Sequence, residues 1–198
     1  MSNPSIPHRF GKATVILLIV ASAGLGPVIS AQPVLAETAV APEKNPPGDI
    51  PDSQAFVTYA NAAGYSLKVP EGWARSETGT DVQFVDKLDA VSVTLSDQKK
   101  AFSLDQAKTA YVPELEKTGR AVKVESVADV TLPLGHAILI AYSANSEPNP
   151  VTSKQVRLEV NRYLIFKAGK MAALDLSAPF GADNVDQWQL MSRSFGWK

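Results

Sequence analysis

The longest alternation of apolar and polar residues in the chain, from Gln155 to Ser177, predicts a long β-hairpin. Apolar side chains recur at every second position of the first strand, with Arg162 as the exception, and the return strand repeats the alternation. Gly169, between the two strands, can adopt the positive φ that a tight hairpin turn requires. The apolar positions are Val156, Leu158, Val160, Leu164 and Phe166, then Ala172, Leu174 and Leu176.

The other face of this hairpin changes character along its length. It begins polar with Arg157, Glu159 and Asn161, and it becomes apolar at Tyr163 and Ile165. Because apolar side chains are favoured away from water, we expect a second layer to cover this face too. The pattern therefore predicts a globular α+β domain and does not indicate a specific activity.

Composition excludes several classes of function. The chain has 198 residues and no Cys, which excludes disulfides, thiolate nucleophiles and the usual zinc ligand sets. A formal net charge of −1 gives no basic field that would attract nucleic acid, so we expect no nucleic-acid partner. The length and the ordinary hydrophobic content predict one folded domain.

Residues 1–36 have the pattern of a secretory signal peptide. Two basic residues and no acid precede an uncharged, mostly apolar run, and cleavage is expected after Ala36, with Ala31 as the second choice. The alternative is an uncleaved anchor, but glycines and a proline interrupt the run well short of about 20 residues. We therefore predict an exported protein with no membrane span after cleavage. Its expected location is the periplasm or the extracellular space, or the thylakoid lumen if the source is photosynthetic.

Residues 37–54 are predicted to form a flexible linker. They contain four prolines and almost no large apolar residue, a composition that cannot offset its own ordering entropy. A Pro-rich ligand for the groove of a partner is the alternative. The folded domain is expected over residues 55–198.

The first half of the domain predicts strands followed by a helix. Strands over residues 65–69, 82–85 and 91–95 are expected to form an antiparallel meander. Ser103 and Gln106 then have the spacing of a capping box, in which each side chain satisfies a free backbone N–H at a helix start. Pro113 is expected to kink or restart this helix, and Gly119 to end it.

The second half predicts two more strands, the hairpin and a last helix. Strands are expected over residues 122–132 and 137–142, and the second of them is apolar enough to be covered on both faces. Asp183 is expected to cap a helix that continues through Ser194. Its apolar stripe, which should pack on the sheet, consists of Val185, Trp188, Met191 and Phe195.

This order of elements resembles the PsbP-like group, which includes the extrinsic protein of the oxygen-evolving complex and many exported bacterial proteins. The resemblance covers residues 56–197 and rests on the element order and on the stretch Gly-Tyr-x-Leu-x-Val-Pro-x-Gly-Trp at Gly64 to Trp73. It implies an αβα sandwich, an antiparallel sheet with helices packed on both faces. It also implies binding or assembly roles rather than catalysis. Some members are lipoproteins or have metal-binding His residues, and this chain has neither the anchor Cys nor a His cluster.

Candidates for catalysis or metal binding are few. His136, the single His after the predicted cleavage site, would need a nucleophile and an orienting acid, so we expect an ordinary hydrogen bond from it. Asp86 and Asp89, with Asp81 and Asp97, could gather around a cation, but they lack the spacing of a calcium loop and are expected to be solvated. No catalytic residue, metal ligand or cofactor is therefore assigned.

Four residues form the candidate partner surface: Trp73, Arg157, Glu159 and Arg162. Trp73 follows a turn, where an exposed indole could anchor a partner, although packing in the core is the alternative. The three hairpin charges could form a recognition strip, with a surface ion-pair ladder as the alternative.

We predict a non-enzymatic exported domain that binds another protein within an envelope or membrane-associated complex. The first alternative is a small-molecule carrier with a pocket between sheet and helix. An apolar cavity beneath Trp73 or Trp188 would favour it. The second is a hydrolase that uses His136.

Overall fold

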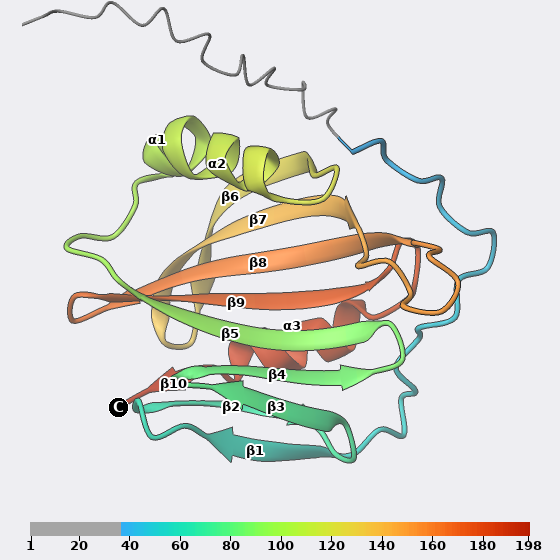
Figure 1. Cartoon of the computed structure of the whole chain (residues 1–198). Coiled ribbons are helices and arrows are strands. Elements are labelled where there is room, and N and C mark those ends of the chain that lie inside the picture. The colour runs from blue at the N-terminus through green and yellow to red at the C-terminus, as the bar shows by residue number, and fades with distance from the viewer. Residues whose placement is uncertain (1–36) are drawn as a thin grey trace, which may run out of the picture. The chain divides into compact units, whose positions relative to one another are not determined.

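The computed structural model describes residues 37–198, and the predicted signal peptide and cleavage site lie outside the described residues. Two antiparallel sheets form the framework of the described part (Figure 1). The large sheet has the strand order β3-β4-β5-β9-β8-β7-β6, and the small sheet has the order β1-β2-β10. The strands are β1 Phe56–Ala60, β2 Tyr65–Pro70, β3 Ala74–Thr78, β4 Asp81–Asp86, β5 Asp89–Asp97, β6 Lys123–Leu132, β7 Gly135–Asn145, β8 Arg157–Lys167, β9 Lys170–Pro179 and β10 Gly196–Trp197.

The predicted hairpin is confirmed as β8 and β9. Its two-residue loop is Ala168-Gly169, and both residues have positive φ, 48° and 82°, as the tightest hairpin loops require. Leu174 lies opposite Tyr163, so the predicted apolar positions Ala172, Leu174 and Leu176 share a face with Tyr163 and Ile165, whereas Met171 and Ala173 share the face of Leu164. Each face of the hairpin therefore presents apolar side chains and is covered.

The expected meander is correct for β4 and β5 only. The strand at Tyr65–Pro70 belongs to the small sheet, where it pairs with β1 and β10. The large sheet instead begins with β3, Ala74–Thr78, an edge strand whose five residues are all exposed. Without a buried face, β3 has no apolar alternation, and for that reason the sequence pattern misses it.

The capping box at Ser103 is confirmed. Ser103 Oγ accepts the N–H of Gln106, and Gln106 Oε1 accepts the N–H of Ser103, at 3.2 and 3.0 Å. Helix α1, Leu104–Gln106, continues through a π-helical turn, Ala107–Tyr111, into α2, Val112–Thr118. Pro113 lies in the first turn of α2, directly after the π-helical turn, and the helix ends at Gly119.

The last helix, α3, Val185–Arg193, differs from its prediction at its start. Asn184 rather than Asp183 is the N-cap residue, and it makes no capping hydrogen bond because its side chain is turned to the chain at Gly48 and Ile50. Val185, predicted to face the sheet, is 71% exposed. Trp188, Met191 and Phe195 are buried as predicted.

The two faces of the large sheet have separate apolar clusters. On one face, residues of β7, β8 and β9 pack with α1 and α2; on the other, Tyr163 and Leu174 pack with Leu67 of the small sheet and with Trp188 and Met191 of α3. The antiparallel sheet that the resemblance implies is confirmed. A helical layer on each face is not, because the domain is mostly sheet and its second face is shared by the small sheet and α3 (Figure 1). No helix in residues 37–198 is long and apolar enough to span a membrane.

Residues 37–54, the N-terminal segment, contain no helix or strand and contact the domain near both ends. The N–H of Val40 donates to Asn145 Oδ1 at 3.0 Å, and the N–H of Ile50 donates to Asn184 Oδ1 at 2.6 Å. The side chain of Ile50 is buried in the core. The predicted flexibility of this segment and the domain boundaries at residues 36 and 54 stay predictions.

Candidate functional site

Arg157, at the start of β8, is buried and 5% exposed. Its Nη1 donates to the carbonyl of Ala121 at 2.8 Å and to Asn145 Oδ1 at 3.0 Å, and its Nη2 donates to Ser143 Oγ at 2.8 Å. Burial lowers the pKa of Arg157, and the charge of Glu125 opposes this effect. Arg157 therefore joins β7, β8 and the residues before β6 from inside the fold.

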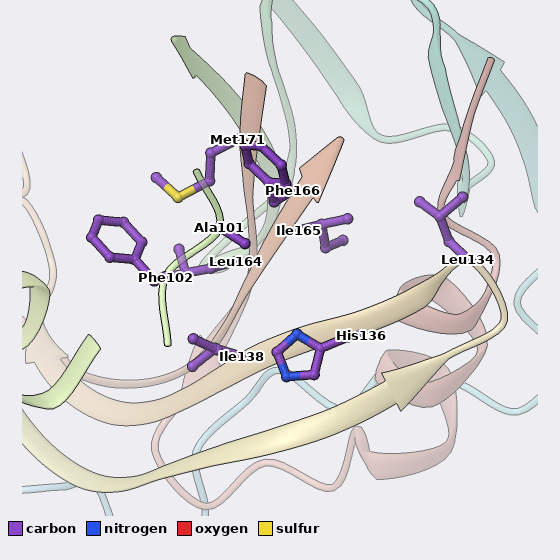
Figure 2. A pocket seen from close by; sticks show the side chains of 9 residues that line it. All are labelled: Ala101, Phe102, Leu134, His136, Ile138, Leu164, Ile165, Phe166 and Met171. Carbon is purple, nitrogen blue, oxygen red and sulfur yellow. The ribbon is translucent and has the colours of Figure 1, made fainter. Parts of the chain in front are cut away.

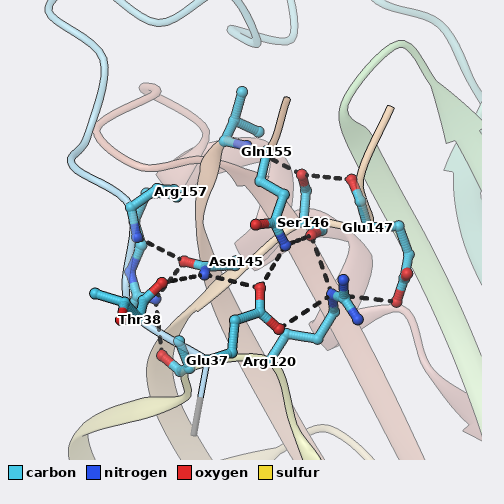
Figure 3. A network of polar contacts seen from close by, with 11 residues as sticks. Glu37, Thr38, Arg120, Asn145, Ser146, Glu147, Gln155 and Arg157 are labelled. Atoms are coloured by element: carbon cyan, nitrogen blue, oxygen red, sulfur yellow. Dashed lines mark hydrogen bonds and ion pairs between the residues drawn. The ribbon is translucent and has the colours of Figure 1, made fainter. Parts of the chain in front are cut away.

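Asn145 extends this internal contact to the N-terminal segment (Figure 3). Its Oδ1 accepts from both Arg157 and the N–H of Val40, and its Nδ2 donates to the carbonyl of Thr38 at 2.8 Å. Asn145 is itself buried. One amide side chain therefore links the start of the N-terminal segment to the ends of β7 and β8.

Glu37 completes the network (Figure 3). Its Oε1 accepts from Asn145 and from Gln155, and its Oε2 lies 3.6 Å from Arg120, which also pairs with Glu147. The hydrogen bonds from Asn145 and Gln155 hold the pKa of Glu37 below its usual value. One carboxylate oxygen of Glu37 therefore accepts two hydrogen bonds, and the other lies beside the positive charge of Arg120.

Glu159 lines a second region, a cavity of about 410 Å³ between the large sheet and α3. Burial raises the pKa of Glu159, the backbone N–H of Gly181 opposes the shift, and the charge of Glu125 adds to it. Trp188 also lines this cavity. The space beside Trp188 has a mixed polar and apolar lining, and so it is not the apolar cavity that would favour a carrier.

Arg162 lies on the opposite face, beneath the helices. Its Nε and Nη2 donate to the two carboxylate oxygens of Asp175 at 2.6 and 2.5 Å, and its Nη1 donates to the hydroxyl of Tyr111 at 3.2 Å. Burial alone would lower the pKa of Arg162, but the hydrogen bonds and charge of Asp175 raise it overall. The exception in the alternation of β8 is thus a partly buried, bidentate ion pair.

The four residues of the candidate partner surface do not meet on one surface. Arg157 and Glu159 belong to the face of α3, Arg162 belongs to the face of α1 and α2, and each is engaged within the fold. Trp73 lies apart from all three, partly buried against the core.

Trp73 lines a cavity of about 210 Å³, which we name the Asp89 cavity. One wall is the N-terminal segment, and another is the β4–β5 turn. Its lining consists of Gly48, Asp49, Ile50, Pro51, Gln54, Trp73, Asp86, Lys87 and Asp89. The sequence predicts that Asp86 and Asp89 are both solvated. Asp86 is exposed, but Asp89 is buried, so the prediction is wrong for Asp89.

An apolar cavity of about 250 Å³, which we name the Phe102 cavity, lies against the large sheet (Figure 2). Phe102, just before the helix, and Ile138, Leu164 and Met171 from three neighbouring strands line it. Its lining comes mainly from strands and from the residues before α1, so it is not a pocket between sheet and helix, and it does not lie beneath Trp73 or Trp188.

His136 stands at the edge of the Phe102 cavity (Figure 2). Its Nε2 lies 2.7 Å from Asp129 Oδ1 on β6, and both side chains are about half exposed. This is the ordinary polar contact expected of a His at the start of a strand. Within residues 37–198, no three His, Cys, Asp or Glu side chains lie close enough together to hold a metal ion.

Sequence reasoning missed the polar side chains that hold the N-terminal segment. Asn145 and Asn184 contact residues 105 and 134 positions away, and no local pattern reports such contacts. For Asp89 the sequence has a weak indication of burial. Asp89 begins an apolar strand directly after a tight charged turn, and residues of such a strand tend to be buried.

These features define an α+β domain dominated by antiparallel sheet. No family model matches the chain, and no curated protein matches its sequence. The solution structure of cyanobacterial PsbP (CyanoP) from Synechocystis sp. PCC 6803 is similar, with a TM-score of 0.51 and 15% identity, covering 76% of this chain and 98% of that chain. The Ran-binding protein Mog1p of Saccharomyces cerevisiae has a TM-score of 0.49 and 15% identity, covering 73% of this chain and 96% of that chain. The match to CyanoP shows that the chain has a PsbP-like fold.

Proposed function

We propose that this protein is an exported, non-enzymatic domain that binds another protein within an envelope or membrane-associated complex. The observation that supports this proposal is the PsbP-like fold, which matches CyanoP over 98% of its length. The resemblance to the PsbP-like group implies binding and assembly roles. Because proteins that share a fold differ in activity, binding to a partner is tested directly.

The test is a pull-down of the tagged full-length protein from native membranes after mild cross-linking, with captured proteins identified by mass spectrometry. We expect one protein or complex in stoichiometric amount, absent when the tag alone is used. Capture of no protein above that background would contradict the proposal. Tracking the size of the protein in the same fractions also tests cleavage after Ala36.

The Phe102 cavity supports a second candidate, a small-molecule carrier. A cavity of about 150 Å³ lined by Leu, Ile and Phe can bind benzene, so about 250 Å³ has room for a somewhat larger apolar group. Mass spectrometry of an organic extract of the purified protein would reveal a co-purifying ligand. Ala101→Phe, at the cavity, should reduce its amount, whereas Ala60→Phe, at an exposed site on β1, should not.

A further inference from the structure

Asp89 is a buried acid that the fold leaves without a partner. It is 6% exposed, and its Oδ1 has no hydrogen-bond partner within residues 37–198. Such an arrangement is costly, because burial removes water from the carboxylate and the protein supplies no donor in its place. Buried polar groups nearly always have partners, so this exception points to a role that is not structural.

The lining of the Asp89 cavity suits a positively charged group. Asp49, Asp86 and Asp89 line it together, and Lys87 is the single basic residue among its lining residues. Trp73 adds an aromatic side chain, and indole rings attract organic cations. Carboxylates form strong, charge-assisted hydrogen bonds with ammonium and guanidinium groups.

The size of the cavity favours an organic cation over a metal ion. Its volume of about 210 Å³ has room for a charged head together with part of an aliphatic stem. The acids are also too far apart to act as a metal cage, since residues 37–198 contain no group of three potential ligands at metal-binding separation. An indole wall contributes to binding an alkylated cation and contributes nothing to coordinating a metal.

We propose that the Asp89 cavity receives a Lys or Arg side chain of the partner protein, with the cationic head at Asp89 and Asp86 and the apolar stem at Trp73. This inference rests on the proposed protein-binding function and names the feature of the partner that would be recognised. The cationic head would supply the opposite charge that the fold does not provide for the Asp89 carboxylate. A charge pair that is shielded from water has the character of an interface hot spot.

A titration with ethylguanidinium, an analogue of the Arg side chain, tests the site on the full-length protein. The readout is the indole N–H resonance of Trp73 in a nitrogen-15 NMR spectrum, assigned with Trp73→Phe. We expect a saturable shift with ethylguanidinium and none with ethylurea, its neutral counterpart. Asp89→Asn should weaken binding at least tenfold. Asp97→Asn, the same change at the exposed far end of β5, should leave it unchanged.

Three results would overturn the site. Equal binding by wild type and Asp89→Asn would show that the orphaned carboxylate is not involved. Equal shifts with ethylurea would show that charge is not recognised. Saturation of the same resonances by calcium chloride but not by ethylguanidinium would make the cavity a metal site.

The pH dependence of binding gives an independent check. Burial chiefly, with the charges of Asp86 and Asp49, raises the pKa of Asp89 to about 7, against the opposing charge of Lys87. Asp86 and Lys87 face Asp89 from the β4–β5 turn, and Asp49 faces it from the N-terminal segment. Ethylguanidinium should therefore bind up to about tenfold more tightly at pH 8 than at pH 6. In Asp89→Asn this rise should disappear, and a flat profile in the wild type would contradict the proposal.

The cross-linking pull-down separates the failure of this inference from the failure of the proposed function. Wild type and Asp97→Asn should capture the partner, and Asp89→Asn should capture at least fivefold less. Equal capture by all three overturns the role of the cavity and leaves protein binding intact. If the wild type captures no protein, the proposed function is overturned, and so is the inference that the cavity receives a Lys or Arg side chain.

Discussion

Both ends of the N-terminal segment are held by an asparagine, but the two sites differ in how completely their buried polar groups are paired. Asn145 accepts the N–H of Val40 within a network that also satisfies Arg157. Asn184 accepts the N–H of Ile50, yet nearby Asp89 has an oxygen without a partner. The first site is built for stability. The second has an unpaired acid, Asp89, beneath the N-terminal segment. A contact that only stabilised the fold would not need an unpaired acid.

The largest effect is expected at the paired site. Arg157→Met keeps the stem but removes the guanidinium, so Ser143 Oγ and the carbonyl of Ala121 lose their donor inside the fold. Leaving buried partners unsatisfied should lower the free energy of unfolding by about 3 kcal/mol. Urea denaturation measures this change. Arg75→Met, at an exposed arginine on edge strand β3, should change it by less than about 1 kcal/mol.

If Arg157→Met and Arg75→Met have equal effects, the buried network contributes little and the contrast between the two sites fails. A loss near the expected size, with an unchanged denaturant slope, would support it.

Asp89 should make stability depend on pH in the direction opposite to a salt-bridged acid. Its pKa is raised from 3.8 to about 7, so between these values the folded state binds more protons than the unfolded state. The free energy of unfolding should therefore fall as pH rises from about 4 to about 7 and stay level above. The full shift would correspond to about 4 kcal/mol, and solvent at the cavity reduces our expectation to about 2 kcal/mol.

Urea denaturation at pH 5 and pH 8 measures this contribution. Asp89→Asn should abolish it and be the more stable protein at pH 8, because no charge is then buried. Asp97→Asn should keep the wild-type dependence, since its side chain is exposed. A wild-type protein that gains stability between pH 5 and pH 8 would contradict the buried, unpaired state of Asp89.

Gly48 tests how closely the chain lies over Asp89. A Cβ at this position would stand 2.7 Å from Pro179 Cδ and 3.1 Å from Asp89 Oδ1, and φ is +142°. Gly48→Ala should therefore cost about 1–2 kcal/mol in the free energy of unfolding. Gly72→Ala, with φ +87° and no atom within 4 Å, measures backbone strain alone and should cost less. Equal costs would mean that the contact of residue 48 with Pro179 and Asp89 is loose.

Sequence patterns predicted those parts of the fold that depend on neighbours in the chain. The hairpin at Gly169 and the capping box at Ser103 follow from alternation and from a three-residue spacing, and both are confirmed. Edge strand β3 was missed because exposure on all sides leaves no periodic signal. Arg157 was assigned to a surface strip because its polar neighbours suggested solvent, whereas its partners come from residues 121, 143 and 145.

The candidate site depended even less on local pattern. Trp73 was chosen for its position after a turn, but the carboxylate beside it becomes notable only through burial, which arises when residues 48–51 cover the β4–β5 turn. Three segments distant in sequence create the cavity. A single sequence gives the identity of these residues but not the distances between them in the folded protein.

The smallest effect compares the two asparagine contacts directly through amide hydrogen exchange. The N–H groups of Val40 and Ile50 both donate to asparagine Oδ1, so each reports the opening of its own part of the N-terminal segment. When opening hydrates Asp89, ionisation of that acid favours the open state. The protection of Ile50, corrected for the intrinsic pH dependence of exchange, should then fall up to about tenfold between pH 6 and pH 8. The protection of Val40 should stay constant, and Asp89→Asn should remove the fall at Ile50. A parallel fall at both amides would mean that the segment opens as one unit and that its two contacts are not energetically distinct.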